Sequence, residues 1–291
     1  MAPNLPPVRG LALLAAVAVL LAGCGDDEST STPAGERSFD ADRAFADLEA
    51  QVAIGPRSSG STANERTARM LAAKLRDAGV QGVHIQHPWR NVVGTIPGDE
   101  PDAIVLGAHF DTKDIPGFVG ANDGASGVAV VLELARALDG QNDGPSVRIA
   151  LFDAEEARGD RPFEEDGTRG SRQYVRSARA NGTLGDVKEM ILLDMVGDCD
   201  LAIPREAGSD PKLYDEVAQA GEPFAGAAPP VLDDHVPFVN AGIPAVDLID
   251  FDYGPGPSPG AYWHTTQDTL DKVCPESLDA VGEAVLQILS R

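Results

Sequence analysis

The sequence predicts an α/β domain of three layers, in which helices cover both faces of a mixed, mostly parallel sheet. Apolar runs of strand length alternate along the chain with segments that carry apolar groups at helical spacing. Helices between successive strands favour parallel pairing, and a parallel sheet is covered on both faces. Of the 291 residues we assign the first 23 to a signal, and the remaining 268 fit one domain because no second boundary is visible.

The individual elements follow from periodicity and from the residues that start or stop them. Residues 62–78 have a helical period and end at Gly79, a common helix stop. Ser126 is expected to cap a helix over 126–138, and Pro275 stands near the start of the last helix. Further helices are expected in GSRQYVRSARAN and PKLYDEVAQA. Strands are expected in VHIQHPWRNVVGTI (two short strands or one bent strand), AIVLGAHFD, SVRIALFDA, KEMILLDMVGD and GIPAVDLIDF.

The first 23 residues are typical of an export signal. Arg9 precedes the apolar run LALLAAVAVLLAG, which is shorter than the roughly 20 residues that a membrane span needs. The sequence LAGC that ends at Cys24 is similar to the bacterial lipobox, which implies cleavage before Cys24 and attachment of lipid to its sulfur. An ordinary secretory cleavage site near Cys24 is the alternative.

These features give three segments: a lipoprotein signal peptide over 1–23, a lipidated Cys24 with a disordered polar tether over 24–38, and the globular domain over 39–291. We therefore expect a protein outside the cytoplasm that is held on the bacterial membrane by its lipid and does not span it.

Charge and cysteine content limit the partners further. Removing the signal, which contains one arginine, leaves 22 basic residues against 46 acidic ones, a formal charge of −24. Such a surface repels phosphate backbones, so we expect no nucleic-acid partner. Outside the cytoplasm, Cys199 and Cys274 either form a disulfide or stay as buried free thiols, and their spacing leaves both open.

Histidines and acids gather in five short segments: GAHFDT, GANDGASG, IALFDAEEA, LLDMVGD and YWHTTQDT. Three of these segments end an expected strand, and ligands in such sheets gather beyond the carboxyl ends of the strands. Taken singly, each segment has a plainer explanation, such as a hydrogen-bonded His-Asp pair, a turn aspartate or a solvated acidic loop. Together they place the following side chains near one edge: His109, Asp111, Asp123, Glu155, Glu156, Asp194 and His264.

This set of side chains indicates a divalent metal site. Zinc binds neutral imidazole and carboxylate, so His109, Asp123, Glu156, Asp194 and His264 are expected to be ligands. Glu155 is then left beside the metal to move protons. Asp111 lies two residues from His109 on the same side of a strand, where it can orient the imidazole from the second shell of ligands.

As an ordered set, from IGPRSSGS to SLDAVGEAV, the segments resemble metallopeptidase family 28, which has the zinc aminopeptidase-like fold. The resemblance covers roughly residues 39–290. It implies that Asp123 lies between two zinc ions and that Glu155 is the general base. It further implies that one zinc is also held by His109 and Asp194, and the other by Glu156 and His264.

A second resemblance is to the glutaminyl cyclase branch of that fold, carried by LDDHVPFVNAGIPAVDLIDFDY and YWHTTQDT. The cyclases have Asp and Trp at the positions of Asp233 and Trp263, where the aminopeptidases usually have Ser and Tyr. At the position of Asp247 the animal cyclases carry histidine, so the sequence departs from them there. Bacterial cyclase-like proteins resemble this chain in having aspartate at that position.

The second resemblance implies a zinc-dependent glutaminyl-peptide cyclotransferase that acts on free N-termini of peptides or proteins. One zinc would be held by Asp123, Glu156 and His264. Glu155 would transfer the proton, Asp194 and Asp233 would hold the amine and the leaving amide, and Trp263 would wall the pocket. The alternatives are a two-zinc aminopeptidase and a non-catalytic surface protein with a structural zinc; a structural site has no use for the spare base Glu155.

Overall fold

The computed structural model describes residues 37–290. The signal peptide, Cys24 and nearly all of the tether lie outside this part of the chain, so their assignments stay predictions. Among the residues described, no helix combines the length and the apolarity that crossing a membrane requires.

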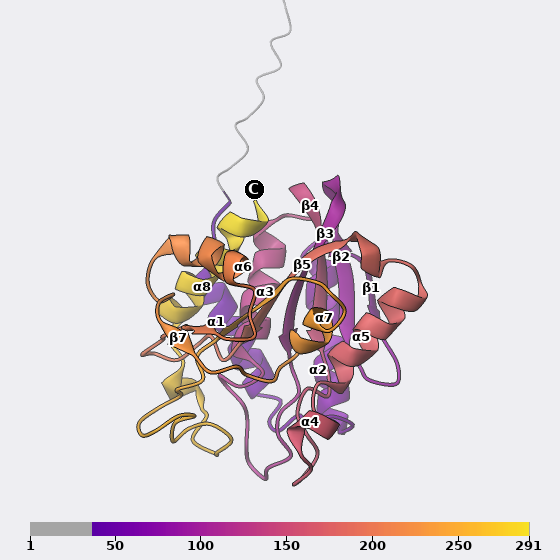
Figure 1. Ribbon diagram of the computed structural model, residues 1–291. Helices are drawn as coiled ribbons and strands as arrows, with labels where there is room; N and C mark the ends of the chain where they lie inside the picture. The colour runs from indigo at the N-terminus through magenta and orange to yellow at the C-terminus, as the bar shows by residue number, and fades with distance from the viewer. Residues whose placement is uncertain (1–36, 291) are drawn as a thin grey trace, which may run out of the picture. The chain divides into compact units, whose positions relative to one another are not determined.

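A six-stranded sheet forms the middle layer (Figure 1). Its strand order is β1-β2-β4-β3-β5-β8. The pairs β3/β4, β3/β5 and β5/β8 are parallel, while β1/β2 and β2/β4 are antiparallel. The expected mixed, mostly parallel sheet is thus confirmed. The strands are β1 (Gln81–Ile85), β2 (Val92–Ile96), β3 (Gly98–His109), β4 (Asn142–Phe152), β5 (Val187–Asp194) and β8 (Ala245–Ile249).

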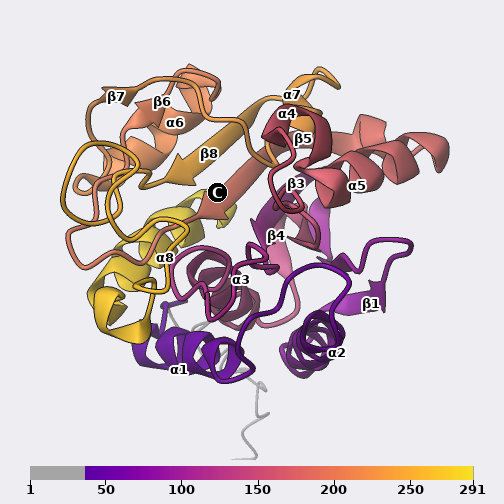
Figure 2. The same ribbon diagram turned by 90° about the horizontal axis from the view of Figure 1, so that it is seen from below.

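Helices cover both faces of this sheet, as Figure 2 shows. One face carries α1 (Ala41–Val52), α2 (Thr62–Asp77), α3 (Ser126–Ala137) and α8 (Pro275–Leu289), and the other carries α5 (Arg169–Ala180) and α7 (Val236–Val239). Helix α6 (Pro211–Val217) packs beside α8 and β8. The remaining short elements are α4 (Phe163–Asp166), β6 (Arg205–Glu206), β7 (Ala227–Ala228) and single 3-10 turns at 184–186, 218–220 and 270–272.

The central strands are apolar on both sides because both of their faces are buried. On β5, Ile191 and Leu193 join the core under α3 and α8, while Met190 and Leu192 join the core under α5 and α7. Alternate side chains of a strand point to opposite faces, so an unbroken apolar run is what a doubly covered strand requires.

Helix α3 packs directly on β5, and Gly127 makes this possible. A Cβ at Gly127 would lie 2.0 Å from the carbonyl oxygen of Leu193, so only glycine fits there. The segment that leads into α3 is thereby brought against the end of β5, which carries Asp194. Close packing of this helix therefore contributes to the site described below.

Most expected elements are found within a few residues of their predicted bounds, but two expectations need correction. The helix at 41–52 was not predicted. Ser126 is not the cap of α3, because Ala125 occupies the cap position and makes no side-chain cap hydrogen bond. The Ser126 hydroxyl donates to the Asn122 carbonyl at 2.6 Å and accepts from the Val196 amide at 3.1 Å, which ties α3 to the segment after β5.

Candidate active site

The site begins where β3, β4 and β5 end at one edge of the sheet. His109 is the last residue of β3 and Asp194 the last of β5, while Glu155 and Glu156 follow β4 after two residues. The backbone turns sharply at two of these exits, since Ala154 and Met195 have φ values of 60° and 48°. This left-handed conformation is unusual for residues with a side chain and often marks a functional site.

Two groups of three side chains meet at this edge, and within each group the three ligand atoms lie within 4.8 Å of one another. The first triad is Asp123, Glu156 and His264, and the second triad is His109, Asp123 and Asp194. Every residue that the sequence predicted as a metal ligand is present in one of them.

Asp123 belongs to both triads because its two oxygens face opposite ways. Oδ1 lies 3.3 Å from Nε2 of His109, and Oδ2 lies 3.3 Å from Nε2 of His264. His109 Nε2 is also 3.1 Å from Oδ1 of Asp194, and His264 Nε2 is 3.0 Å from Oε1 of Glu156. The carboxylate of Asp123 is therefore placed as a bridge between two positions.

The donor set fits a divalent cation. Oδ2 of Asp123 and both carboxylate oxygens of Glu156 are buried and make no hydrogen bond among the described residues, although His264 Nε2 or Lys113 Nζ lies within 3.0 to 3.3 Å of each. Buried carboxylate oxygens are costly unless a cation or a hydrogen bond compensates their charge. Imidazole nitrogen and carboxylate oxygen are ligands that zinc prefers, and each triad supplies three of them, which leaves a position open for water or substrate.

The pKa values of the triad residues show that the two triads favour a positive charge. Although burial opposes it, the contacts with Asp123 and Glu156 raise the pKa of His264 to about 9. Burial and the nearby Asp123 raise the pKa of the Glu156 carboxyl. A metal ion that binds here displaces a proton, so protons and metal compete for the site.

Asp111 lies beside His109 but makes its hydrogen bonds elsewhere. Its Oδ1 is 3.8 Å from His109 Nδ1, too far for a hydrogen bond, and the carboxylate accepts from the backbone amides of Glu155 and Glu156 at 3.0 and 3.3 Å. In this arrangement Asp111 fixes the turn after β4 and so positions both glutamates.

Glu155 is buried next to the triads and faces further acids. Burial is the main cause that raises the pKa of Glu155 well above its ordinary value. The charges of Glu156 and other acids raise it further, while the nearby His109 opposes the shift. Burial and the charges of Asp247, Asp194 and Glu155 do the same to Asp233, which is 2% exposed. Asp233 therefore lies within electrostatic range of the site and is closed to solvent.

Two residues after Asp233, a buried histidine lies between two acids. Nδ1 of His235 lies 3.6 Å from Oδ2 of Asp247, and Nε2 lies 3.5 Å from Oε1 of Glu206. The exposed fraction of these three residues is 1% or less. Asp247, the position at which the chain departs from the animal cyclases, thus has a histidine as its neighbour in space.

Trp263 forms an apolar wall beside the first triad. Its ring stacks on the imidazole of His264, with centroids 3.8 Å apart and planes inclined by 16°. Phe251 makes an edge contact with Trp263 at 5.4 Å. The tryptophan is half-buried, so part of it stays open to a ligand.

Asp268 holds the backbone of Asp123, the residue shared by both triads, and this role was not predicted from the sequence. Its carboxylate accepts from the backbone amides of Asn122 and Asp123 at 2.8 and 3.1 Å and from the hydroxyl of Tyr253 at 2.8 Å. In YWHTTQDT this acid stands between Gln267 and Thr269 and looks like a loop residue. Its place four residues after His264 was the available signal.

Arg57 was also not identified, although it lies in the quoted segment IGPRSSGS. It is fully buried, and its guanidinium donates to the carbonyl oxygens of Phe110, Val119 and Gly120. It therefore holds the loop between His109 and Asp123 in place. Burial of an arginine is uncommon and has no signature in a single sequence.

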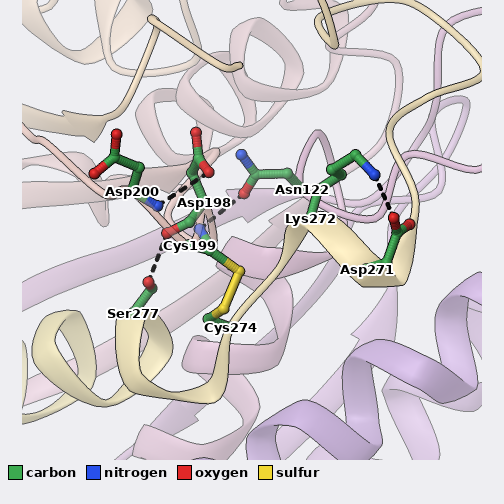
Figure 3. The surroundings of a disulfide bond; sticks show 9 residues. Asn122, Asp198, Cys199, Asp200, Asp271, Lys272, Cys274 and Ser277 are labelled. Carbon is green, nitrogen blue, oxygen red and sulfur yellow. Dashed lines mark hydrogen bonds and ion pairs between the residues drawn. A yellow bond between two sulfur atoms is a disulfide. The ribbon is translucent and has the colours of Figure 1, made fainter. Parts of the chain in front are cut away.

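Cys199 and Cys274 form a disulfide, which settles the question that the sequence left open (Figure 3). The bond joins the segment after β5 to the segment before α8, and the two backbones also exchange hydrogen bonds, Cys199 N to Lys272 O at 3.2 Å and Cys274 N to Gly197 O at 3.0 Å. The amide of Gly197 in turn donates to Asn122 Oδ1 at 2.8 Å. The crosslink thus lies next to the segment that carries Asp123.

The fold and the two triads define the class: an α/β protein with a candidate metal site at the carboxyl edge of its sheet. A family model described as Peptidase family M28 matches residues 91–289, and the chain belongs to this family. This confirms the resemblance found in the sequence.

Among the similar proteins, some are named as glutaminyl cyclases and others as aminopeptidases. Over 271 residues the chain is 27% identical to a glutaminyl-peptide cyclotransferase of Drosophila melanogaster, covering 75% of this chain and 72% of that protein. It spans 64% of the length of the protein of the same name from Gloydius blomhoffii.

Among solved structures, an Acidobacteriales bacterium glutaminyl cyclase superposes with a TM-score of 0.79 at 30% identity, covering 92% of this chain and 99% of that one. A leucine aminopeptidase precursor from Bacteroides thetaiotaomicron superposes with a TM-score of 0.76 at 27% identity, covering 87% and 98%.

Proposed function

We propose that this protein is a zinc-dependent glutaminyl-peptide cyclotransferase, which converts an N-terminal glutamine of a peptide or protein into pyroglutamate with loss of ammonia. The observation that carries the proposal is the environment of Asp233 and Trp263, the two positions that distinguish the cyclase pattern. Asp233 is buried within electrostatic range of Glu155 and Asp194, and Trp263 stacks on His264. The similarity to glutaminyl cyclases supports it further.

Asp123, Glu156 and His264 would hold one zinc ion, and their buried carboxylate oxygens, which make no hydrogen bond to the described residues, support this choice. When bound, the zinc supplies Lewis-acid polarisation of the side-chain amide carbonyl of the substrate. The second triad, His109, Asp123 and Asp194, is complete as well, so a second ion has a place to bind.

The side chains around the metal perform the proton transfer. Glu155 takes a proton from the substrate α-amine as its nitrogen forms a bond to the side-chain amide carbon, and returns that proton to the departing NH₂ group, which leaves as ammonia. Asp194 and Asp233 hold the amine and the leaving amide, and Trp263 closes the pocket around the folded-back side chain. Since the reaction is intramolecular, holding that conformation supplies much of the rate.

The alternative is an aminopeptidase with two zinc ions, which hydrolyses the N-terminal peptide bond. It is favoured by the completeness of the second triad and by relatives named as aminopeptidases. Both enzymes act on a free N-terminus. They differ in whether the nucleophile is the substrate's own amine or water.

Two peptides separate these functions. The purified protein is incubated with zinc and with one peptide that begins with Gln and one that begins with Leu, and the products are followed by mass. Loss of ammonia from the first peptide without trimming of the second is expected. Release of a free amino acid from either peptide, without cyclisation, would refute the cyclase.

The double variant Asp233→Ser, Trp263→Tyr tests the two residues on which the choice between cyclase and aminopeptidase rests. Cyclisation should fall strongly, while zinc content stays at the wild-type level because neither residue is a ligand. Asp215→Ser, a change of the same kind at an exposed position on α6, should leave cyclisation unchanged. A double variant that cyclises as fast as wild type would remove both residues from the mechanism.

We also propose that the catalytic domain over 39–291 is held outside the cytoplasm by a lipid on Cys24. The support is the signal and lipobox pattern of residues 1–24. Replacing Cys24 with Ser should move the protein from the membrane fraction to the soluble fraction. If the variant still sediments with membranes and the wild-type mass includes no lipid, the anchor is wrong.

A further inference from the structure

A lysine lies against the first triad and has no part in the function proposed above. Lys113 follows the segment GAHFDT in the loop between β3 and α3. Its Nζ lies 3.3 Å from Oε2 of Glu156, and its side chain is only 17% exposed. A partly buried lysine whose ammonium group contacts a predicted metal ligand needs an explanation, because the ammonium group and a metal ion would compete for the same carboxylate.

The contact divides the two oxygens of Glu156 between two cations. Oε1 lies 3.0 Å from His264 and therefore points into the first triad, while Oε2 points to Lys113. Neither oxygen has another hydrogen-bond partner among the described residues. Glu156 is thus oriented to offer one oxygen, and not both, to an ion in the triad.

Lys113 also brings a positive charge to a place where the described residues supply no other lysine or arginine as an ion-pair partner. Within residues 37–290, Lys113 is the only lysine or arginine in ion-pair contact with a carboxylate of either triad. Arg57 is close, but its guanidinium is taken up by three backbone carbonyl oxygens. The repulsion of Lys113 acts on any cation that binds at the first triad.

We propose that Lys113 is a positioning residue of the metal centre, which holds Glu156 as a one-oxygen ligand and lowers the affinity of the centre for divalent cations. A one-oxygen Glu156 leaves a coordination position free for the carbonyl oxygen of the substrate, as a catalytic site requires. The role rests on the metal centre of the proposed function, but not on which of the two reactions is catalysed.

Zinc affinity of the metal-free full-length protein tests this role, measured by competition with a chromophoric chelator at fixed pH. Lys113→Met keeps the length of the side chain and removes its charge, so zinc should bind about tenfold more tightly than to wild type. Lys113→Arg restores the charge and should bind zinc within about twofold of wild type. Lys74→Met is the matched control for the change in net charge, since Lys74 pairs with Asp47 and with no carboxylate of the triads.

The sign of the change separates this role from a structural one. A lysine that only supported the fold would weaken zinc binding when removed, so equal or weaker binding by Lys113→Met overturns the proposal. If that variant does not fold, Lys113→Gln is measured in its place with the same expectation. A wild-type protein that binds no zinc would refute the metal centre itself, whereas wild-type binding without a gain in the variant would refute only the role of Lys113.

Discussion

Removing the crosslink between Cys199 and Cys274 should destabilise the fold far more than an ordinary surface substitution does. The perturbation is the double replacement Cys199→Ser, Cys274→Ser, made in a chain that already carries Cys24→Ser so that the thiol count is unambiguous. The bond joins positions 75 residues apart, and it links the segment after β5 to the segment before α8. Without it, the unfolded chain gains the freedom of a large open loop.

The size of the effect follows from loop-closure entropy. For a loop of 75 residues the chain-entropy relation gives about 15 cal/mol/K, or about 4.5 kcal/mol at 25 °C. The backbone hydrogen bonds Cys199 N to Lys272 O and Cys274 N to Gly197 O keep the two segments together after the sulfurs are removed, so the native state loses little. We therefore expect a loss of about 2 to 4.5 kcal/mol in the free energy of unfolding.

Urea unfolding measures this loss in the free energy of unfolding. The protein is kept free of zinc, because the thiol reagents used to reduce the disulfide would also bind zinc. The midpoint of the double variant should fall, and wild type kept reduced should unfold at the same urea concentration as the variant. The reasoning is refuted if the oxidised wild type shows two reactive thiols besides Cys24, or if the variant is destabilised by less than about 1 kcal/mol.

Three further predictions concern single residues. Replacing Glu155 with Gln should leave zinc content and the native fold unchanged and lower turnover about a hundredfold or more, the usual weight of a general base, so near-normal turnover would remove Glu155 from the mechanism. Replacing Glu156 or His264 with Ala should abolish zinc retention and activity together, because each removes a ligand of the first triad; an inactive variant with full zinc by metal analysis would contradict this assignment. Burial raises the pKa of Asp250 to about 6. The folded state therefore holds this proton more tightly than the unfolded chain, whose aspartate pKa is about 3.9, and the stabilisation present below about pH 4 is lost as pH rises to 6. Compared with wild type, Asp250→Asn should gain stability over that interval, and a difference in urea midpoint that stays constant from pH 4 to pH 7 would argue against it.

The strands and most helices were predictable because their signal is local. A strand such as β5 is apolar on both faces, and its run of apolar residues is legible without any knowledge of its neighbours. Helix α1 was missed because its buried side includes polar residues that interrupt the apolar pattern. Asp47 pairs with Lys74, and Gln51 donates to the carbonyl oxygen of Ala125, so these partners lie far away in the sequence.

The convergence of the candidate ligands at the strand ends was predictable for a related reason. His109 and Asp194 meet because parallel neighbours end at one edge, which follows from the topology alone. Asp123 and His264 come from loops, and their convergence depends on long-range contacts. The carboxylate of Asp268 holds the backbone of Asp123, and such a contact leaves no trace in residue spacing.

The fold does not distinguish the two reactions, since proteins named as a cyclase and as an aminopeptidase superpose on this chain with TM-scores of 0.79 and 0.76. The difference must lie in side chains that touch the substrate and not the metal. Water has to reach the substrate carbonyl in a peptidase, whereas a cyclase has to fold the substrate so that its own amine takes that place. A broad ring stacked on His264 narrows the space beside the first triad. A buried carboxylate at Asp233 supplies a fixed acceptor for N–H groups, which a serine, with its shorter side chain, would reach less well. Under the proposed function, these two features would restrict the conformation of the substrate without changing the candidate metal ligands, so the choice between the two reactions would depend on Asp233 and Trp263.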